Sequence, residues 1–351
     1  MRVAIDISPL KNANRYRGVG IYTNQLAESL KSLNISDFSF KLIENGEITK
    51  DCDLIHYPFF DLFFITLPLK KTKPTVVTIH DTIPLVFPEH YPPGVKGNLK
   101  FQSQKFSLKN VKAVITDSEN SKKDIFKYLN YPQEKIYIVP LAPGKEFKKL
   151  EIGNWKLEIK QKYQLPDTFV LYVGDVNYNK NLIGLIRAFK HTFEESKPTS
   201  KVKLVLVGKA FLDETLKETK QILQLIKSLK LNKGVIRLGW IPPKELVGVY
   251  NLATVYCQPS FYEGFGLPVL EAMACGCPVV AANTSSLPEI CGKAAIMVNP
   301  YNINSIASGI KKVLYDISIY DILRKKGLEW VKNFTWEKVA QKTYEVYKKV
   351  V

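Results

Sequence analysis

Short apolar runs recur along the 351 residues and alternate with segments of helical periodicity. The runs are rich in β-branched residues and do not alternate between apolar and polar, so strands formed from them would be buried on both faces. The expected strands are 2–7, 53–57, 75–80, 112–117, 135–139, 168–174, 203–208, 234–239, 253–259, 278–282 and 294–298. Parallel strands that alternate with helices predict doubly wound α/β domains.

The series of strands is interrupted once, over residues 141–166. This stretch contains glycine and proline and no expected strand, which indicates an interdomain link. The length of the chain is typical of two domains. We therefore expect an N-terminal domain over 1–163, completed by a C-terminal helix over 335–351, and a second domain over 164–334. The other expected helices include 21–31, 96–109, 180–193, 214–230, 303–316 and 318–331.

The charge and the cysteines limit the classes of partner and compartment. The formal net charge is +17, which attracts anions such as phosphorylated small molecules, acidic lipid or nucleic acid. The lysines are spread along the chain without an aromatic-basic RNA motif, so a nucleic-acid-binding protein stays the non-enzyme alternative and nucleic acid is not the expected partner. Five unpatterned cysteines, and no apolar run of signal-peptide or membrane-helix length, favour a cytoplasmic protein.

The stretch SFYEGFGLPVLEAMACG, from residue 260, joins the end of an expected strand to a helix. Pro268 fits the first turn of that helix, where a missing N–H costs little. Gly264 and Gly266 allow the backbone to approach a ligand closely. The amides of Phe265, Gly266 and Leu267 point off the helix start and, with the helix dipole, form an anion site.

Two carboxylates, Glu263 and Glu271, flank this anion site. Carboxylates accept hydrogen bonds, and two vicinal hydroxyl groups of a sugar suit such a pair of acceptor oxygens. The segment therefore indicates a ligand with phosphate in the middle and hydroxyl groups at both ends, as in a nucleotide sugar. The alternative interpretation is that Glu263 caps the helix and Glu271 is solvated.

With its continuation CPVVAANTSSLPEI, this stretch resembles the donor-binding segment of family 4 glycosyltransferases, which are retaining enzymes. LYVGDVNYNKNLIGLIRAF is similar to the first strand, loop and helix of the family's second domain. IDISPLKNANRYRGVGIYTNQLAESL and TIHDTIPLVFPEHYP resemble its first domain. The resemblance is nearest to mannosyltransferases of bacterial surface polysaccharides.

This resemblance implies the GT-B fold, with two Rossmann-like domains facing a central cleft. It implies transfer of a hexosyl group, mannose from GDP-mannose as the first expectation, to a glycan or lipid-linked glycan. A UDP-sugar-dependent glucosyl- or N-acetylglucosaminyltransferase of the same fold is the alternative. A sugar-nucleotide epimerase and a phosphorylase-like protein are the other enzyme alternatives.

The resemblance also implies roles for the residues of the second domain. Glu271 would hold the ribose hydroxyls, and Glu263 would lie beside the donor sugar and the reacting centre. The amides of residues 265–267 would contact sugar hydroxyl and phosphate. Lys180 would neutralise the diphosphate leaving group, where a fixed cation stabilises the charge that develops.

The chain departs from the family at the phosphate site. Many relatives carry an arginine just after the glycine of this segment or just before the lysine. In this chain these two positions are Asp175 and Asn179. Arg187 and Lys209 are the candidate replacements for that second cation.

In the first domain, the resemblance implies that His80 lies near donor sugar and acceptor. It would serve as a general base, or position the acceptor while the leaving phosphate takes the proton. His56 also ends an expected strand and is interpreted as structural. Gly18 and Gly20 do not complete a dinucleotide fingerprint, but their loop would face a phosphate, as its equivalent does in the family.

No metal and no cofactor beyond the donor substrate is expected. The sequence Asp51-Cys52-Asp53 precedes a strand, at the amino end of the sheet, and is interpreted as structural.

A segment of the first domain is suited to a membrane surface. FFDLFFITLPLKK, residues 59–71, is apolar and ends in lysines, and the expected helix 96–109 adds Lys96, Lys100, Lys105 and Lys109. Apolar side chains beside lysines can dock shallowly on anionic lipid. Peripheral contact with an anionic membrane is therefore a hypothesis, and burial of residues 59–69 is the alternative.

Overall fold

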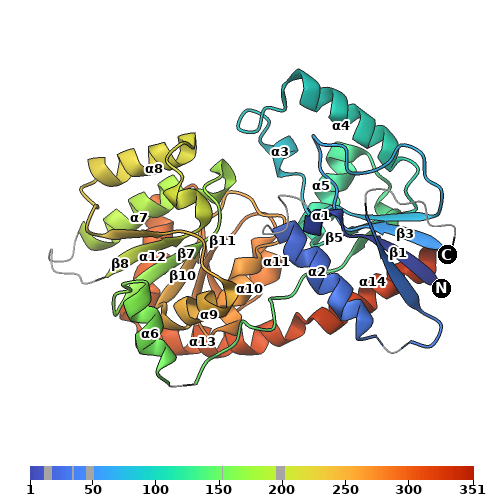
Figure 1. Ribbon diagram of the computed structural model, residues 1–351. Coiled ribbons are helices and arrows are strands. Elements are labelled where there is room, and N and C mark those ends of the chain that lie inside the picture. Colours follow the sequence, from blue (N-terminus) through green and yellow to red (C-terminus); the bar gives the residue numbers. More distant parts are fainter. Residues whose placement is uncertain (12–17, 34, 45–50, 152, 195–201) are drawn as a thin grey trace. The chain divides into compact units, whose positions relative to one another are not determined.

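The computed structural model describes residues 1–11, 18–33, 35–44, 51–151, 153–194 and 202–351. The chain forms two compact units (Figure 1). The first unit consists of Met1–Ala142 and Phe334–Val351, and the second of Pro143–Asn333. The second unit starts earlier than the boundary at 163/164 that the sequence suggested. The reason is the helix α6 (Trp155–Lys162), which forms within the expected link 141–166 and packs on α9 (Pro243–Leu252) of the second unit.

The sheet of the first unit has six parallel strands in the order β2-β1-β3-β4-β5-β6. They are β1 Arg2–Asp6, β2 Ser39–Ile43, β3 Leu54–Tyr57, β4 Thr75–Thr78, β5 Ala113–Thr116 and β6 Ile136–Ile138. Among the described residues, β2 is the strand that the sequence did not predict. It lies at the sheet edge and is largely exposed, so it lacks the apolar run that identifies the buried strands.

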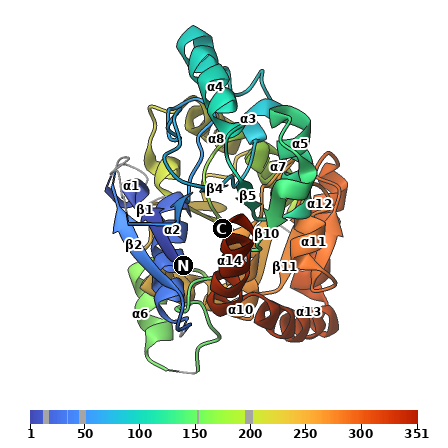
Figure 2. The ribbon, with the colours of Figure 1, turned by 90° about the vertical axis from the view of Figure 1, so that its right-hand side faces the viewer.

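The helices of the first unit come from its N-terminal part and from the C-terminal end of the chain. They are α1 Ser8–Lys11, α2 Gly18–Lys31, α3 Ile83–Val86, α4 Gly94–Leu108, α5 Glu119–Leu129 and α14 Trp336–Val350. The C-terminal helix α14 packs on α2, β4 and β5 (Figure 2). It buries Trp336, Val339 and Val346 on one face, which is the pattern of an amphipathic helix against a core.

The sheet of the second unit also has six parallel strands, in the order β12-β11-β10-β7-β8-β9. They are β7 Phe169–Val173, β8 Lys203–Val207, β9 Val235–Leu238, β10 Val255–Gln258, β11 Val279–Ala282 and β12 Ala295–Val298. The strand order reverses between the neighbours β7 and β10. In open α/β sheets, ligands bind at the carboxyl ends of the strands at such a switch point.

Two groups of helices flank this sheet. The remaining helices of the second unit are α7 Leu182–Glu194, α8 Lys217–Ser228, α9 Pro243–Leu252, α10 Leu267–Ala274, α11 Leu287–Cys291, α12 Ile303–Tyr315 and α13 Ile317–Trp330. Helix α7 packs on α8 and α12, whereas α10 packs on α9, α11 and α13 (Figure 1). The strands are thus buried between helices, as their continuous apolar runs predicted.

Candidate active site

The switch point of the second unit brings Lys180 and Glu263 together. Lys180 ends a short 3-10 turn that follows β7, and Glu263 lies in the loop that follows β10. The Nζ atom of Lys180 is 2.7 Å from Oε2 of Glu263 and 3.0 Å from Oε1. Two residues chosen from separate stretches of sequence therefore form one ion pair, at the place where a doubly wound sheet binds its ligand.

The carboxylate of Glu263 is almost fully buried, with 5% of the residue exposed. Gln258 donates from Nε2 to Oε1 of Glu263 at 2.8 Å, and Ser260 donates from Oγ to the same atom at 2.7 Å. A buried charge is costly unless it is paired and hydrogen-bonded, and this one is both. The N-cap residue of α10 is Gly266, and the Glu263 carboxylate instead contacts Lys180, Gln258 and Ser260, so the capping alternative is wrong.

The turn before α10 requires glycine at position 266. Gly266 has φ +106°, and a Cβ atom there would lie 2.7 Å from Cδ2 of Leu287. The helix then begins at Leu267, with Pro268 in its first turn as expected. The backbone therefore turns sharply at the start of α10, where the amides of the first helical turn point along the helix axis.

Two serines from the loop after β11 fix the turn from the other side. Ser286 donates from Oγ to the carbonyl oxygens of Glu263 at 3.0 Å and Phe265 at 2.8 Å. Ser285 accepts a hydrogen bond from the amide of Glu263 at 2.9 Å. Gly264 and Phe265 are buried. The loop is therefore rigidly held before any ligand arrives.

Glu271 lies on α10 and is partly buried. Its Oε2 atom accepts a hydrogen bond from the Tyr250 hydroxyl at 2.9 Å. Burial raises the pKa of Glu271 to about 7, the Tyr250 hydrogen bond opposes this, and the Glu146 carboxylate adds to it. The charged carboxylate is thus held in a place that disfavours it, which is typical of residues that bind a ligand.

Of the two candidates for the second cation, Lys209 lies at the carboxyl end of the sheet. It begins a 3-10 turn directly after β8, the strand beside β7. Arg187 lies exposed within α7. The turn before Lys209 passes very close to the neighbouring loop, since a Cβ atom on Gly208 would lie 2.0 Å from the carbonyl oxygen of Gly174. Its position at the carboxyl edge of the sheet favours Lys209 over Arg187 as the second cation.

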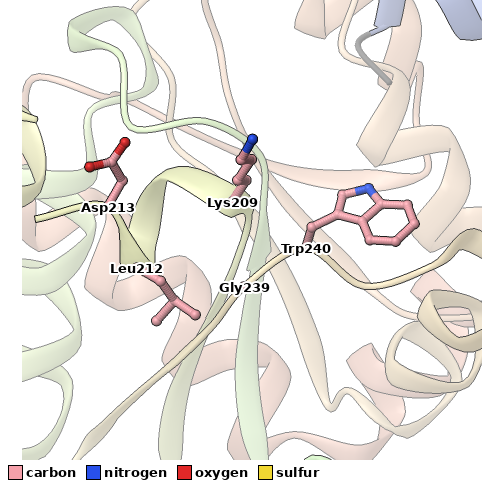
Figure 3. A pocket seen from close by; sticks show the side chains of 5 residues that line it. All are labelled: Lys209, Leu212, Asp213, Gly239 and Trp240. Carbon is pink, nitrogen blue, oxygen red and sulfur yellow. The ribbon is translucent and has the colours of Figure 1, made fainter. Parts of the chain in front are cut away.

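Lys209 also lines a pocket of about 420 Å³ at the carboxyl ends of β8 and β9. The other lining residues are Leu212, Asp213, Gly239 and Trp240. Figure 3 shows Lys209 between the Asp213 carboxylate on one side and the Trp240 indole on the other. Trp240 is 56% exposed, which is unusual for so large an apolar ring. The sequence analysis did not single out this pocket.

In the first unit, His80 pairs with Asp117. They follow β4 and β5, which are neighbours in the sheet, and Nδ1 of His80 is 2.7 Å from Oδ2 of Asp117. Nε2 of His80 and Oδ1 of Asp117 are buried and have no hydrogen-bond partner among the described residues. Buried polar atoms without partners are rare, and a bound ligand is one explanation for them.

Burial lowers the pKa of His80, but the charge and hydrogen bond of Asp117 outweigh burial and raise it; the Asp81 carboxylate and the Pro58 carbonyl act in the same direction. Burial raises the pKa of Asp117, against the opposing effect of His80. Sequence reasoning missed Asp117, although its place at the end of the expected strand 112–117 was a usable signal.

His56 is structural, as interpreted from the sequence. It is fully buried, with Nδ1 2.7 Å from the Tyr347 hydroxyl and Nε2 2.9 Å from Oγ1 of Thr78. Burial lowers its pKa to about 3, so the ring stays neutral and both nitrogens are occupied. It ties β3 and β4 to the C-terminal helix α14.

Gly18 and Gly20 lie in the first turn of α2 rather than in a loop ahead of it, so the expected helix start at residue 21 was wrong. A Cβ atom on Gly18 would meet nothing within 4 Å, and Gly20 is buried. The residues before them, 12–17, lie outside the described residues. A phosphate contact by these glycines stays a prediction.

Within the described ranges, no group of three or more His, Cys, Asp or Glu side chains could hold a metal ion. Asp53 of the D-x-D sequence accepts a hydrogen bond from the Arg2 amide at 2.7 Å, at the amino end of the sheet. Independence of metal remains a prediction.

Two family models together cover most of the chain. The family described as glycosyl transferases group 1 matches residues 155–330, and the one described as glycosyltransferase family 4 matches residues 37–142. Among curated proteins, the chain is 33% identical over 282 residues to O-antigen chain mannosyltransferase B of Escherichia coli, which covers 79% of this chain and 71% of that protein. It is 27% identical over 294 residues to the serotype-specific mannosyltransferase WbdA of Escherichia coli, which covers 83% of this chain but only 35% of the relative.

Solved structures agree on the fold. The sucrose-phosphate synthase of Thermosynechococcus elongatus superposes with a TM-score of 0.77 at 20% identity, over 99% of this chain and 98% of that one. Anabaena HepE, solved in complex with UDP and glucose, superposes with a TM-score of 0.74 at 17% identity, over 99% and 100% of the two chains. The chain therefore belongs to glycosyltransferase family 4 and is a glycosyltransferase built from two Rossmann-like domains, the GT-B architecture.

Proposed function

We propose that the protein is a retaining mannosyltransferase that moves mannose from GDP-mannose to a glycan or lipid-linked glycan. The names of its curated relatives support mannose as the sugar and surface polysaccharide as the product. The observation that carries the proposal is the Lys180–Glu263 pair at the switch point of the donor-binding unit.

Lys180 would stabilise the diphosphate leaving group. As the bond between sugar and phosphate breaks, negative charge builds on the phosphate oxygens, and a fixed ammonium group lowers the barrier. Glu263 would then lie beside the sugar ring and accept a hydrogen bond from one of its hydroxyls. Lys209, at the end of the adjacent strand, would supply the second cation that many relatives obtain from arginine.

Glu271 would hold the ribose. Two vicinal hydroxyls donating to one carboxylate favour its charged form and thus lower the raised pKa. The pocket beside Lys209 would receive the base, with the exposed Trp240 ring stacked on it and the Asp213 carboxylate as an acceptor for the N–H groups of guanine.

His80 would contact the acceptor. In its neutral form, with Asp117 accepting from Nδ1–H, the His80 ring would present Nε2 as an acceptor for the hydroxyl group that attacks the sugar. In a same-face reaction the leaving phosphate takes that proton, and the histidine orients the hydroxyl. No step of this scheme needs a metal ion.

A surface on α4 supports peripheral attachment to an anionic membrane. Phe64, Ile65, Val95, Leu99 and Phe106 are each more than half exposed. Helix α4 contains Lys96, Lys100 and Lys105 and no acidic residue, and Nζ of Lys100 lies 4.8 Å from the ring centroid of Phe64. Apolar side chains between lysines match the acyl and headgroup layers of anionic lipid. None of the described helices is long and apolar enough to cross a bilayer.

The segment 59–71 was interpreted either as a membrane-docking surface or as a buried segment, and its residues are partly of each kind. Phe60, Leu62 and Leu67 are buried, whereas Phe64 and Leu69 are exposed. We expect the protein to sediment with phosphatidylglycerol vesicles at low salt and Leu99→Ser to weaken this. Leu157→Ser, at a similarly exposed position on α6, is the matched control. If the unaltered protein did not sediment with these vesicles, peripheral attachment to an anionic membrane would be refuted.

Thermal stability against a nucleotide panel tests the donor. The panel is GDP-mannose, GDP, UDP-glucose, UDP-N-acetylglucosamine and UDP. A ligand at 100 times its Kd stabilises by about 2.7 kcal/mol. Since about 1 kcal/mol raises the melting temperature of a unit of this size by roughly 2–4 °C, the expected shift is roughly 5–11 °C. A shift with GDP compounds, lost in Glu271→Ala and kept in the exposed control Glu329→Ala, is the expected result. A shift with UDP compounds alone would overturn GDP-mannose, and no shift at all would refute the proposed site.

A further inference from the structure

Three aromatic rings pack together, and two of them lie in the segments that carry Lys180 and Glu263. Tyr178 is two residues before Lys180, Phe261 is two residues before Glu263, and Tyr301 follows β12. The Phe261 and Tyr301 rings are stacked with centroids 4.9 Å apart and an interplanar angle of 20°. The Tyr178 and Phe261 centroids are 5.3 Å apart at 36°. The rings come from three different loops at the carboxyl end of one sheet.

The residues on either side of Lys180 tie these loops together. The Asn179 carbonyl oxygen accepts from the Phe261 amide at 2.8 Å, and its side chain donates to the Tyr262 carbonyl at 2.8 Å. Asn181 donates from Nδ2 to the carbonyl oxygens of Pro259 at 2.9 Å and Pro300 at 2.8 Å.

Both asparagines are buried, and Asn181 has φ +54°, a conformation that asparagine tolerates better than most residues. Tyr178, Phe261 and Tyr301 are thus part of one rigid framework, which also fixes Lys180.

The two tyrosines remain open to solvent, although each packs against Phe261, which is partly buried. Tyr301 is 68% exposed and Tyr178 is 38% exposed. A cluster built only to fill a core would be buried, and contiguous exposed apolar surface commonly marks a binding site. Tyrosine offers a large, rigid contact face that loses little conformational entropy on binding.

The chemistry of these rings suits a sugar. One face of a pyranose carries polarised C–H groups, and the negative face of an aromatic ring attracts them. We propose that Tyr178, Phe261 and Tyr301 form a stacking platform for a pyranose ring of the acceptor glycan. The inference rests on the proposed function, because it takes Lys180 and Glu263 as the place where the donor sugar reacts.

The position of the aromatic cluster favours binding of the acceptor sugar over binding of the donor. The donor's phosphate and ribose are assigned to Lys180 and Glu271, so the platform is not needed to hold the nucleotide. The acceptor hydroxyl must come within about 3–3.5 Å of the reacting carbon. Tyr178 lies in the same turn as Lys180, and Phe261 lies in the same loop as Glu263, so a sugar stacked on this cluster would lie on the segments that carry the ion pair.

The test is direct sugar binding, measured by saturation-transfer NMR on the whole protein without nucleotide. The probes are methyl α-mannopyranoside, methyl α-glucopyranoside, methyl β-galactopyranoside and methyl N-acetyl-β-glucosaminide. We expect transfer to the ring C–H protons of at least one glycoside. Tyr301→Ala should reduce it at least fivefold, and Tyr301→Phe should retain it because the ring face is kept.

Tyr315→Ala is the matched control, since Tyr315 is a 60% exposed tyrosine of the same unit on α12. It should leave the signal unchanged. Absence of transfer in the unaltered protein, or its persistence in Tyr301→Ala, would overturn the platform. Nucleotide-induced thermal shifts, measured separately, should be equal in all these variants. A failure of the proposed donor would therefore appear in that second experiment and not in the first.

Discussion

Replacing Glu271 by glutamine should stabilise the empty protein at alkaline pH and abolish nucleotide binding. The pKa of Glu271 is raised from 4.5 to about 7. The folded protein therefore holds this proton more tightly than the unfolded chain does. As the pH rises from 4.5 to 7, the unfolded chain loses the proton first, and the free energy of unfolding falls. Above pH 7 the full destabilisation by the charged carboxylate is present.

The difference between a pKa of 4.5 and a pKa of about 7 corresponds to about 3 kcal/mol in the free energy of unfolding. Because Glu271 keeps some contact with solvent, we expect about 2 kcal/mol to be realised. Glutamine is neutral at every pH and still accepts the Tyr250 hydroxyl through its amide oxygen. Glu271→Gln should therefore match the unaltered protein near pH 5 and exceed its unfolding free energy by about 2 kcal/mol at pH 8.

Urea unfolding at pH 5, 6, 7 and 8 measures this difference, followed by a probe in the second unit because two units need not unfold together. Glu329→Gln, at an exposed site on α13, should show no pH-dependent difference. If Glu271→Gln differs from the unaltered protein by the same amount at pH 5 and pH 8, the carboxylate is not disfavoured by its site and the reasoning is wrong. Opposite effects on stability and on GDP binding would identify Glu271 as a ligand residue.

Three further perturbations follow from the contacts. Lys180→Met should lower kcat by about 10²–10³, as loss of one charge-stabilising group commonly does; an unchanged kcat would exclude it from the reaction. Asp117→Asn should lower the pKa of His80 and move the acidic limb of the pH–rate profile to lower pH, with donor affinity unchanged; an unshifted limb would separate His80 from the rate. Gly208→Ala should lower the melting temperature by many degrees, because its Cβ would lie 2.0 Å from a carbonyl oxygen; near-native melting would show that the loops can separate.

The sequence predicted the buried strands of the fold but missed the exposed edge strand β2 and the helix α6, which has no buried residue. Strands such as 168–174 and 278–282 carry apolar residues on both faces, so burial leaves a continuous pattern. The edge strand β2 pairs on one side only and needs no such pattern. Helix α6 has no buried residue, so it lacks the apolar stripe by which other helices were recognised.

The sequence offered candidate site residues where a motif can be recognised within a short segment. Lys180, Glu263 and Glu271 each belong to a motif that can be read locally. Their partners could not be found in this way, since Tyr250 reaches Glu271 from another helix and Asp117 reaches His80 from another strand. A useful signal was nevertheless present, because polar residues at the carboxyl ends of parallel strands meet at one edge of the sheet.

The hydrogen bonds of Glu263 bear on the proposed role of Lys180 as a cation for the donor diphosphate. If a diphosphate attracted the Lys180 ammonium group, as we propose, Glu263 would retain the hydrogen bonds from Gln258 and Ser260. The charge of Glu263 would then still be stabilised by these two hydrogen-bond donors. Movement of Lys180 from Glu263 to the diphosphate would therefore leave no buried carboxylate without a partner. Removing Gln258 and Ser260 together should therefore weaken donor binding more than it disturbs the empty fold, since Lys180 alone satisfies Glu263 only while no phosphate is bound.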